Sequence, residues 1–297
     1  MSVFSVLPTP FSASGDFDPD SLTRVIDLFL ADGVTGFTAL GVTSEVARLT
    51  EAERERVLDT VVTHVSGRVP VVAGTTAEGL RTCIEYTRRA KAAGASAVMI
   101  SPPRMPKINS DAVARHFAEV ATAVDVPIFV QDYPPISGYA MEASLLARIA
   151  REVPAARTIK LEDPPTPFKT SRILEQTGGL NVRVYGGLGG VFLLEELMAG
   201  AAGAMTGFAF PAVLVRIVTL YRSGRIDDAA DAFYRHVPLM RFEFQEGIGM
   251  AIRKEVLRRR SAIAHAGIRP PGGTLDETTR RALDRVLAWS ALPELKT

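Results

Sequence analysis

The chain of 297 residues contains a single cysteine, Cys83. It therefore cannot form a disulfide within itself, and this cysteine usage is typical of a reducing compartment. An excess of charge of one sign is also lacking, because 34 Lys and Arg residues face 33 Asp and Glu residues, for a formal net charge of +1. This balance argues against a surface that binds nucleic acid or membranes through bulk charge.

Long apolar runs and targeting signals are missing too. No apolar run approaches the roughly 18 residues that a membrane-spanning helix requires. The first residues, MSVFSVLPTPF, have no basic segment and reach a proline at position 8, so we expect no signal peptide. The four histidines lack H-x-H or H-E-x-x-H spacing, so we expect no metal site. These absences predict a soluble, cytoplasmic protein without nucleic-acid or membrane partners.

Regularly alternating short β-branched runs and amphipathic helical stretches make up most of the chain. The predicted strands span residues 3–7, 36–40, 70–73, 97–101, 127–131, 157–160, 182–185 and 203–206. Strict alternation predicts parallel strands, and eight units in about 220 residues predict a closed (β/α)8 TIM barrel. The rival fold, a doubly wound open sheet, usually carries a G-x-G-x-x-G signature after its first strand, where this chain has PTPFSASG.

A helical segment follows the last strand–helix unit. Its periodicity predicts helices over residues 226–241, 247–265 and 275–289. We therefore divide the chain into a barrel domain, residues 1–224, and a C-terminal helical extension packed on it, residues 225–297.

Lysine is scarce, and one lysine has an unusual position. The chain has lysine only at positions 91, 107, 160, 169, 254 and 296. Barrel active sites lie at the C-terminal ends of the strands, and Lys160 ends the apolar run from Thr158. A desolvated lysine has a depressed pKa and can form a Schiff base with a carbonyl substrate. The alternative is a structural lysine paired with Glu162 or Asp163.

The other five lysines are poorer candidates, because they lie in predicted helices, an outer loop or the tail. Lys254 and residues 258–260 form the only basic run, which we expect to be a solvated helix face.

The segment GVTSE, residues 41–45, follows the second predicted strand. Gly41, Thr43 and Ser44 can present backbone N–H groups and hydroxyls to a carboxylate, although the segment is also typical of an ordinary strand-to-helix turn. Combined with an inward lysine, it predicts a site for a 2-keto acid, with the carboxylate on Thr43 and Ser44 and the ketone on Lys160.

Five segments together resemble a known family: TPF (9–11), GVTSE (41–45), VQDYPPISG (130–138), IKLED (159–163) and GGLGG (186–190). Over essentially its whole length the chain is similar to the dihydrodipicolinate synthase / N-acetylneuraminate lyase family. The resemblance implies a (β/α)8 barrel and a class I lyase that forms a covalent imine without metal or cofactor. It further implies that Lys160 is the Schiff-base lysine, that residues 41–45 bind the substrate carboxylate, and that the chain forms a homo-oligomer, a tetramer or dimer.

Several positions depart from the family pattern. Gln131 replaces the proton-transferring tyrosine of the Tyr-Asn-x-Pro-x-x-x-Gly motif, and Asp132 replaces the asparagine. Val42 replaces the hydroxyl residue of the proton relay, and Ile136 replaces the arginine that binds the second substrate in dihydrodipicolinate synthesis. The paired tyrosines after the fourth strand are replaced by Pro103 and Arg104. These losses argue against dihydrodipicolinate synthesis itself.

Other side chains must then supply the proton transfer and the remaining contacts. A buried Glu162 or Asp132 could act as general acid/base, the alternative for each being a salt bridge or a loop cap. Tyr133 is either a hydroxyl donor or a wall residue, and Arg104 either binds a substrate carboxylate or lies at a rim or subunit interface. Gly187 and Met205, near the ends of the last two strands, complete the predicted substrate-binding residues.

The tyrosine-poor fifth strand and the segment GAAGAMTGF look most similar to 2-keto-3-deoxy sugar-acid dehydratases, such as those acting on L-2-keto-3-deoxyarabonate. We therefore expect dehydration of such an acid, with a pyruvate-dependent aldolase as the alternative. A non-catalytic, ligand-binding barrel is the alternative from another class.

Overall fold

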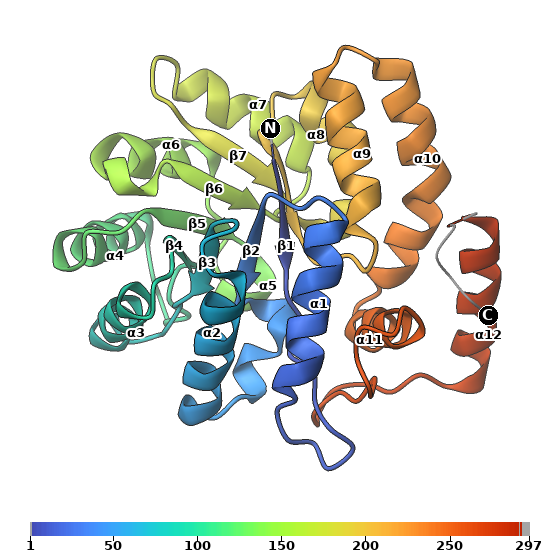
Figure 1. The fold of residues 1–297 in the computed structure, drawn as a ribbon. Coiled ribbons are helices and arrows are strands. Elements are labelled where there is room, and N and C mark those ends of the chain that lie inside the picture. Colours follow the sequence, from blue (N-terminus) through green and yellow to red (C-terminus); the bar gives the residue numbers. More distant parts are fainter. Residues whose placement is uncertain (1, 291, 293–297) are drawn as a thin grey trace.

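Eight parallel strands form a closed barrel in chain order in the computed structural model, which describes residues 2–290 and residue 292 (Figure 1). The strands are β1 (Ser2–Val6), β2 (Gly36–Ala39), β3 (Val71–Gly74), β4 (Ala97–Ile100), β5 (Ile128–Asp132), β6 (Thr158–Leu161), β7 (Arg183–Gly186) and β8 (Gly203–Thr206). Because β1 pairs with both β2 and β8, no strand edge is left open. The predicted TIM barrel is confirmed.

Helices surround the barrel on its outside (Figure 1). They are α1 (Pro19–Ala31), α2 (Glu51–Val65), α3 (Leu80–Ala92), α4 (Ser110–Ala123), α6 (Ala143–Glu152), α7 (Thr166–Gln176), α8 (Leu193–Met198) and α9 (Pro211–Arg222). A short α5 (Pro134–Ser137) follows β5, and the described residues also form the 3-10 turns η1 (Val42–Ser44), η2 (Val46–Arg48), η3 (Pro154–Ala156) and η4 (Leu188–Gly190). The extension contains α10 (Ile226–Glu243), α11 (Gly249–Arg259) and α12 (Glu277–Trp289).

Local sequence explains where these helices begin. The Thr50 hydroxyl accepts a hydrogen bond from the Glu53 N–H, and the Glu53 carboxylate accepts one from the Thr50 N–H. This capping box satisfies two donors that a helix start would otherwise leave unpaired, so α2 begins at Glu51. Asp18 caps α1 in a similar way, by accepting from the Ser21 N–H.

The seam between β1 and β8 depends on a glycine. Gly203 has a φ of +142°, and a Cβ at this position would lie 1.8 Å from the Ser2 carbonyl oxygen. No side chain fits there, so the close approach of the two strands requires glycine.

An apolar layer fills much of the barrel interior. It consists of Phe4, Val72, Ala97, Met99, Phe129, Tyr185 and Met205. The Phe4 and Tyr185 rings meet edge to face at 5.5 Å, and the Tyr185 hydroxyl is hydrogen-bonded to the Ser2 hydroxyl at 2.9 Å. Since this layer fills the interior, polar chemistry inside the barrel is confined to the C-terminal ends of the strands.

The C-terminal extension differs from its prediction in one helix. The helix expected over residues 247–265 ends at Arg259, and the chain turns at Ser261, whose φ is +58°. At this turn the Arg260 guanidinium bonds Asp32 at 3.1 Å, which ties the extension to the end of α1. Among the described residues, 260–276 contain no helix.

The boundary proposed between residues 224 and 225 falls in the turn between α9 and α10, and the division into two domains stays a prediction. Residues 291 and 293–297 of the predicted extension, with Lys296, lie outside the described residues. No helix in the described part of the chain is long and apolar enough to cross a membrane.

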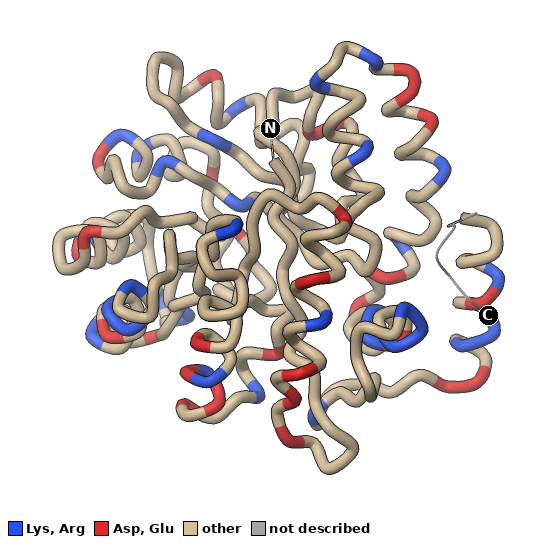
Figure 2. The backbone as a smooth tube through the Cα atoms, in the orientation of Figure 1, with Lys and Arg blue, Asp and Glu red and all other residues tan. Residues whose placement is uncertain are grey.

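The prediction that Lys254 lies on a solvated helix face is wrong. Figure 2 shows basic residues gathered around α11, yet the Lys254 side chain is fully buried. Its Nζ lies 2.5 Å from Glu45 Oε1, donates to the Gly267 carbonyl at 2.9 Å and lies 4.3 Å from the Phe11 ring centre. The pair thus links the loop after β2 to the extension, an arrangement that helical periodicity does not reveal.

We expect Lys254→Met to lower the free energy of unfolding by about 3–5 kcal/mol, because it leaves the Glu45 carboxylate buried without its closest cation. Urea unfolding followed by circular dichroism measures the change. Adding Glu45→Gln to this variant should recover part of the loss, and Lys91→Met, on the exposed face of α3, serves as the control. An unchanged unfolding midpoint in Lys254→Met would contradict the role of the pair.

Candidate active site

Lys160 projects into the barrel from β6 at the mouth formed by the C-terminal ends of the strands. Its side chain is 5% exposed. The register of the parallel pairs places it beside Gln131 of β5 and Tyr185 of β7. The Tyr185 hydroxyl is hydrogen-bonded to Ser2 at the opposite end of the barrel. Of the two residues paired with Lys160 on the adjacent strands, Gln131 is therefore the one whose polar group lies near the lysine.

A chain of polar contacts crosses from β6 to β4 at this mouth. Lys160 Nζ lies 2.9 Å from Glu162 Oε2, and Gln131 Nε2 donates to the same oxygen at 2.6 Å. The Ser101 hydroxyl donates to Gln131 Oε1 at 3.1 Å. The amide of Gln131 is therefore held at both ends, and it fixes the Glu162 carboxylate against the amine.

Two glycines, the last residue of β7 and the residue after it, make room for buried carboxyl groups. A Cβ on Gly187 would lie 2.3 Å from Glu162 Cγ, and a Cβ on Gly186 would lie 1.6 Å from Glu196 Oε2. Gly187 therefore acts by packing against Glu162. The GGLGG segment needs glycine at both positions because side chains there would displace the two carboxyl groups.

Glu196 of α8 is a buried acid that the sequence analysis missed. Burial raises its pKa to about 8, against the opposing effect of the Thr166 hydroxyl, which donates to its Oε1 at 2.6 Å. The negative charges of Glu195 and Glu162 raise the pKa further. The group is thus neutral at pH 7, and no motif marks it, since it lies in an ordinary amphipathic helix.

Ser44 and Thr43, the hydroxyl residues of the loop after β2, have different surroundings. The Ser44 hydroxyl donates to the Leu7 carbonyl at 2.6 Å and accepts from the Gly41 N–H at 3.1 Å, so it holds the turn together. The Thr43 hydroxyl is buried without a hydrogen-bond partner among the described residues. Thr43 is therefore the hydroxyl of this loop that is available to a ligand.

Asp132 points away from Lys160, in contrast to its expected place in the site. Successive side chains of a strand point to opposite faces, so the neighbour of Gln131 faces the helices. The Asp132 carboxylate accepts from Lys169 of α7 at 2.5 Å and from the Met141 N–H at 3.4 Å. Burial raises its pKa to about 6, and Lys169 opposes the shift.

Tyr133 and Met205 also differ in their access to the site. Tyr133, half-buried before α5, has its pKa raised by burial and by the negative charges of Glu162 and Glu246, which places its phenol near Glu162. Met205 is fully buried in the apolar layer of the barrel.

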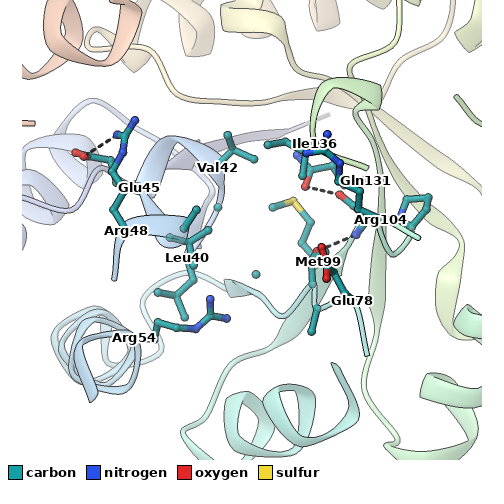
Figure 3. Close-up of a pocket in the computed structure, with 18 residues that line it drawn as sticks. Leu40, Val42, Glu45, Arg48, Arg54, Glu78, Met99, Arg104, Gln131 and Ile136 are labelled. Carbon is teal, nitrogen blue, oxygen red and sulfur yellow. Dashed lines mark hydrogen bonds and ion pairs between the residues drawn. The ribbon is translucent and has the colours of Figure 1, made fainter. Parts of the chain in front are cut away.

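A cavity of about 520 Å³ opens above this layer at the barrel mouth (Figure 3). Its lining includes Gly41, Val42, Thr76, Ser101, Arg104 and Gln131. Gln131 and Ser101 connect the cavity to Glu162 and Lys160 through the hydrogen bonds described above. Ser101 was missed by the sequence analysis, although its place at the end of a predicted strand could have identified it.

Lys169 and Lys254 are also buried, although both lie on helices. Lys169 bonds the carboxylates of Asp132 and Asp163, and Lys254 bonds Glu45. Among the described lysines, Lys160 is thus the buried one inside the barrel. Within the same described part of the chain, no group of three or more His, Cys, Asp and Glu side chains is placed to hold a metal ion.

The family model described as the dihydrodipicolinate synthetase family matches residues 1–289. The chain belongs to this family. It is 34% identical over 287 residues to L-2-keto-3-deoxyarabonate dehydratase of Azospirillum brasilense, covering 95% of this chain and 91% of that protein. It is 32% identical to 4-hydroxy-tetrahydrodipicolinate synthase of Methanoculleus marisnigri, covering 96% and 97%.

A solved structure supports the same assignment. The crystal structure of dihydrodipicolinate synthase from Rhodopseudomonas palustris superimposes with a TM-score of 0.91 at 33% identity, covering 97% of each chain. As a member of the dihydrodipicolinate synthetase family, the chain is a class I lyase, of the kind that acts on pyruvate or related keto acids through a Schiff-base lysine.

The raised pKa of Glu196 should make the free energy of unfolding depend on pH. The raised pKa in the folded state means that this group stabilises the fold fully below about pH 4.5, and that the contribution is lost as pH rises toward about 8. Glu196→Gln removes the titration. We therefore expect the free energy of unfolding of the wild type to fall more steeply between pH 5 and 8 than that of the variant. The difference should approach one proton, about 1.4 kcal/mol per pH unit.

Urea unfolding of both proteins at several pH values in this range measures the difference. Parallel pH dependences would show that Glu196 does not carry the raised pKa. The comparison between the two proteins cancels the contributions of Asp132 and Glu243, whose pKa values are also raised by burial.

Proposed function

We propose that this lyase dehydrates a 2-keto-3-deoxy sugar acid through an imine on Lys160. The observation that carries the proposal is the Glu162 carboxylate, 2.9 Å from Lys160 Nζ and held by Gln131. Gln131 takes the place of the family tyrosine and cannot transfer a proton as a phenol can. A carboxylate beside the amine is the nearest group that can move protons at the substrate carbons.

The reaction begins when the Lys160 amine attacks the C2 ketone. A C2–N bond forms, and the ketone oxygen leaves as water. Glu162, as the nearest base, accepts the proton that the ammonium form must lose and returns it to the departing ketone oxygen, so that it is ionised again when the iminium has formed. The positive iminium then acidifies the hydrogens on C3, because the electron pair left by deprotonation is delocalised onto nitrogen.

Elimination follows from the same contacts. Glu162 removes a proton from C3 to give an enamine, and the C4–O bond then breaks with expulsion of the hydroxyl. The leaving oxygen takes a proton from Glu162, so a molecule of water departs and the carboxylate is regenerated. Hydrolysis of the conjugated iminium releases an unsaturated 2-keto acid and the free amine, with a net loss of one water.

The substrate carboxylate is assigned to the loop after β2. Gly41 and Val42 line the cavity, and the neighbouring Thr43 hydroxyl is unpaired. Ser44 supports this loop through its hydrogen bond to Leu7 and has no hydroxyl proton left for the substrate. Tyr133, near Glu162, is a second hydroxyl that can assist the departure of the C4 oxygen.

Retro-aldol cleavage to pyruvate is the second candidate function, and the similarity to the Methanoculleus synthase favours it. It shares every step through the iminium but requires removal of the C4 hydroxyl proton. The product separates the two reactions, because cleavage yields pyruvate and dehydration does not. A homo-oligomeric assembly and a cytoplasmic location stay predictions.

Borohydride trapping tests the imine. Incubation with pyruvate and sodium borohydride should reduce the imine to a stable secondary amine on Lys160, and peptide mass spectrometry should locate it. Lys160→Arg is expected to abolish the adduct, whereas Lys91→Arg, with an exposed lysine, should retain it. A folded wild-type protein without an adduct, with pyruvate and with 2-keto-3-deoxy acids, would favour the non-catalytic barrel.

Glu162→Gln tests the general acid/base. The variant should still form some reduced adduct, since the amine is present, but kcat for loss of water should fall by about 100- to 10,000-fold. Asp132→Asn is the matched control, because its carboxylate bonds Lys169 on the other face of β5, and its kcat should change far less. Equal losses in both variants would contradict the assignment of Glu162.

A further inference from the structure

We propose that Arg104 selects substrates that carry a second anionic group, a carboxylate or phosphate, at the end remote from the keto acid. The inference rests on the proposed function, because it assumes that the keto-acid end is bound at Lys160. It narrows the substrate from sugar acids in general to those with a terminal anion.

Arg104 lines the cavity from the loop after β4. It makes no hydrogen bond or ion pair with any residue in the described part of the chain. Its aliphatic part packs over Gly138, where a Cβ would lie 3.7 Å from Arg104 Cγ and 3.8 Å from its Nε. The side chain thus lies against Gly138 at the exposed rim of the cavity, and its N–H groups are open to solvent and to a ligand.

Arg104 belongs to the sector of the barrel mouth that contains the reacting groups. Figure 3 shows it on the same side of the cavity as Gln131, across from Arg48 and Glu45. The contacts from Ser101 through Gln131 to Glu162 connect the end of β4 with β6. A substrate joined to Lys160 at C2, with its carboxylate toward the loop after β2, would extend its remaining carbons toward the loop after β4.

The side chains that line the cavity carry more positive than negative charge, which favours an anionic ligand. The lining contains Arg48, Arg54 and Arg104 against Glu45 and Glu78. Glu45 is already paired with both Arg48 and the buried Lys254. A substrate whose single carboxylate is bound at the loop after β2 would leave the excess positive charge of the lining without a counter-charge. A second anionic group on the substrate would pair with that charge.

Arg104 is better placed than Arg54 to be the selective cation. The Arg54 guanidinium lies 4.4 Å from the centre of the Tyr86 ring and is engaged by it. A free, planar guanidinium can form two parallel hydrogen bonds with a carboxylate or a phosphate, which an ammonium cannot do. A neutral hydroxymethyl end offers neither the charge nor the paired acceptors.

The test compares three 2-keto-3-deoxy acids of six carbons that differ only at C6: a hydroxymethyl group, a carboxylate and a phosphate ester. For the wild type we expect kcat/KM to be about 10- to 100-fold higher for at least one terminal anion than for the hydroxymethyl compound. The larger of the two anionic values identifies the natural terminal group. Equal values for all three compounds would overturn the proposal.

Arg104→Gln should remove the preference by raising KM for the anionic substrate, with little change for the hydroxymethyl compound. Arg104→Lys should restore only part of it, because the paired geometry is lost. Arg54→Gln removes the same charge from the same cavity and is the matched control. If Arg54→Gln loses as much of the preference as Arg104→Gln, the preference arises from the summed positive charge of the cavity. That result would overturn the specific role of Arg104.

Trapping with pyruvate separates this inference from the proposed function, since pyruvate has no remote end. Arg104→Gln should form the reduced Lys160 adduct as the wild type does. If the wild type forms the adduct and turns over all three acids equally, the inference fails and the proposed function stands. If no adduct forms with any keto acid, the proposed function fails.

Discussion

The buried pair of Lys160 and Glu162 is the interaction around which the barrel mouth is organised. Removing two charges from water costs several kcal/mol per ion, and the cost is met only when the ions bond each other and their remaining polar atoms are satisfied. Gln131 bonds the carboxylate, Ser101 bonds the amide of Gln131, and Gly187 leaves space for the Glu162 side chain. The proposed proton transfers use the same contacts that offset the desolvation cost of the buried pair.

The second organising contact is the pair of Glu45 and Lys254. Glu45 belongs to the segment whose sequence predicts a ligand-binding loop. Its carboxylate, however, bonds Lys254 of α11 and accepts from the Arg269 N–H. The loop that presents Thr43 is therefore held by the C-terminal extension. This coupling gives the extension a part in the geometry of the site, although none of its described residues lines the cavity at the barrel mouth.

Much of the fold and part of the site could be predicted from the sequence, and particular residues show why the rest could not. Lys160 was identifiable because a lysine that ends an apolar strand of a barrel must lie at its mouth. Strand alternation could have excluded Asp132 once Gln131 was placed inward. Lys169, Lys254 and Glu196 lie on helices with ordinary polar faces. Their burial results from neighbours distant in sequence, such as Glu45 for Lys254 and Thr166 for Glu196.

The sequence by itself determined the alternation of strands and helices, the parallel barrel that follows from it, and the single lysine at the end of an interior strand. These features depend on residue type and local spacing, which a sequence contains directly. The tertiary structure decided which carboxylate faces that lysine. It also decided which hydroxyl of the loop after β2 and which arginine of the cavity have no partner among residues 2–290 and 292. Those properties arise only when closure of the barrel brings separate strand ends within hydrogen-bonding distance.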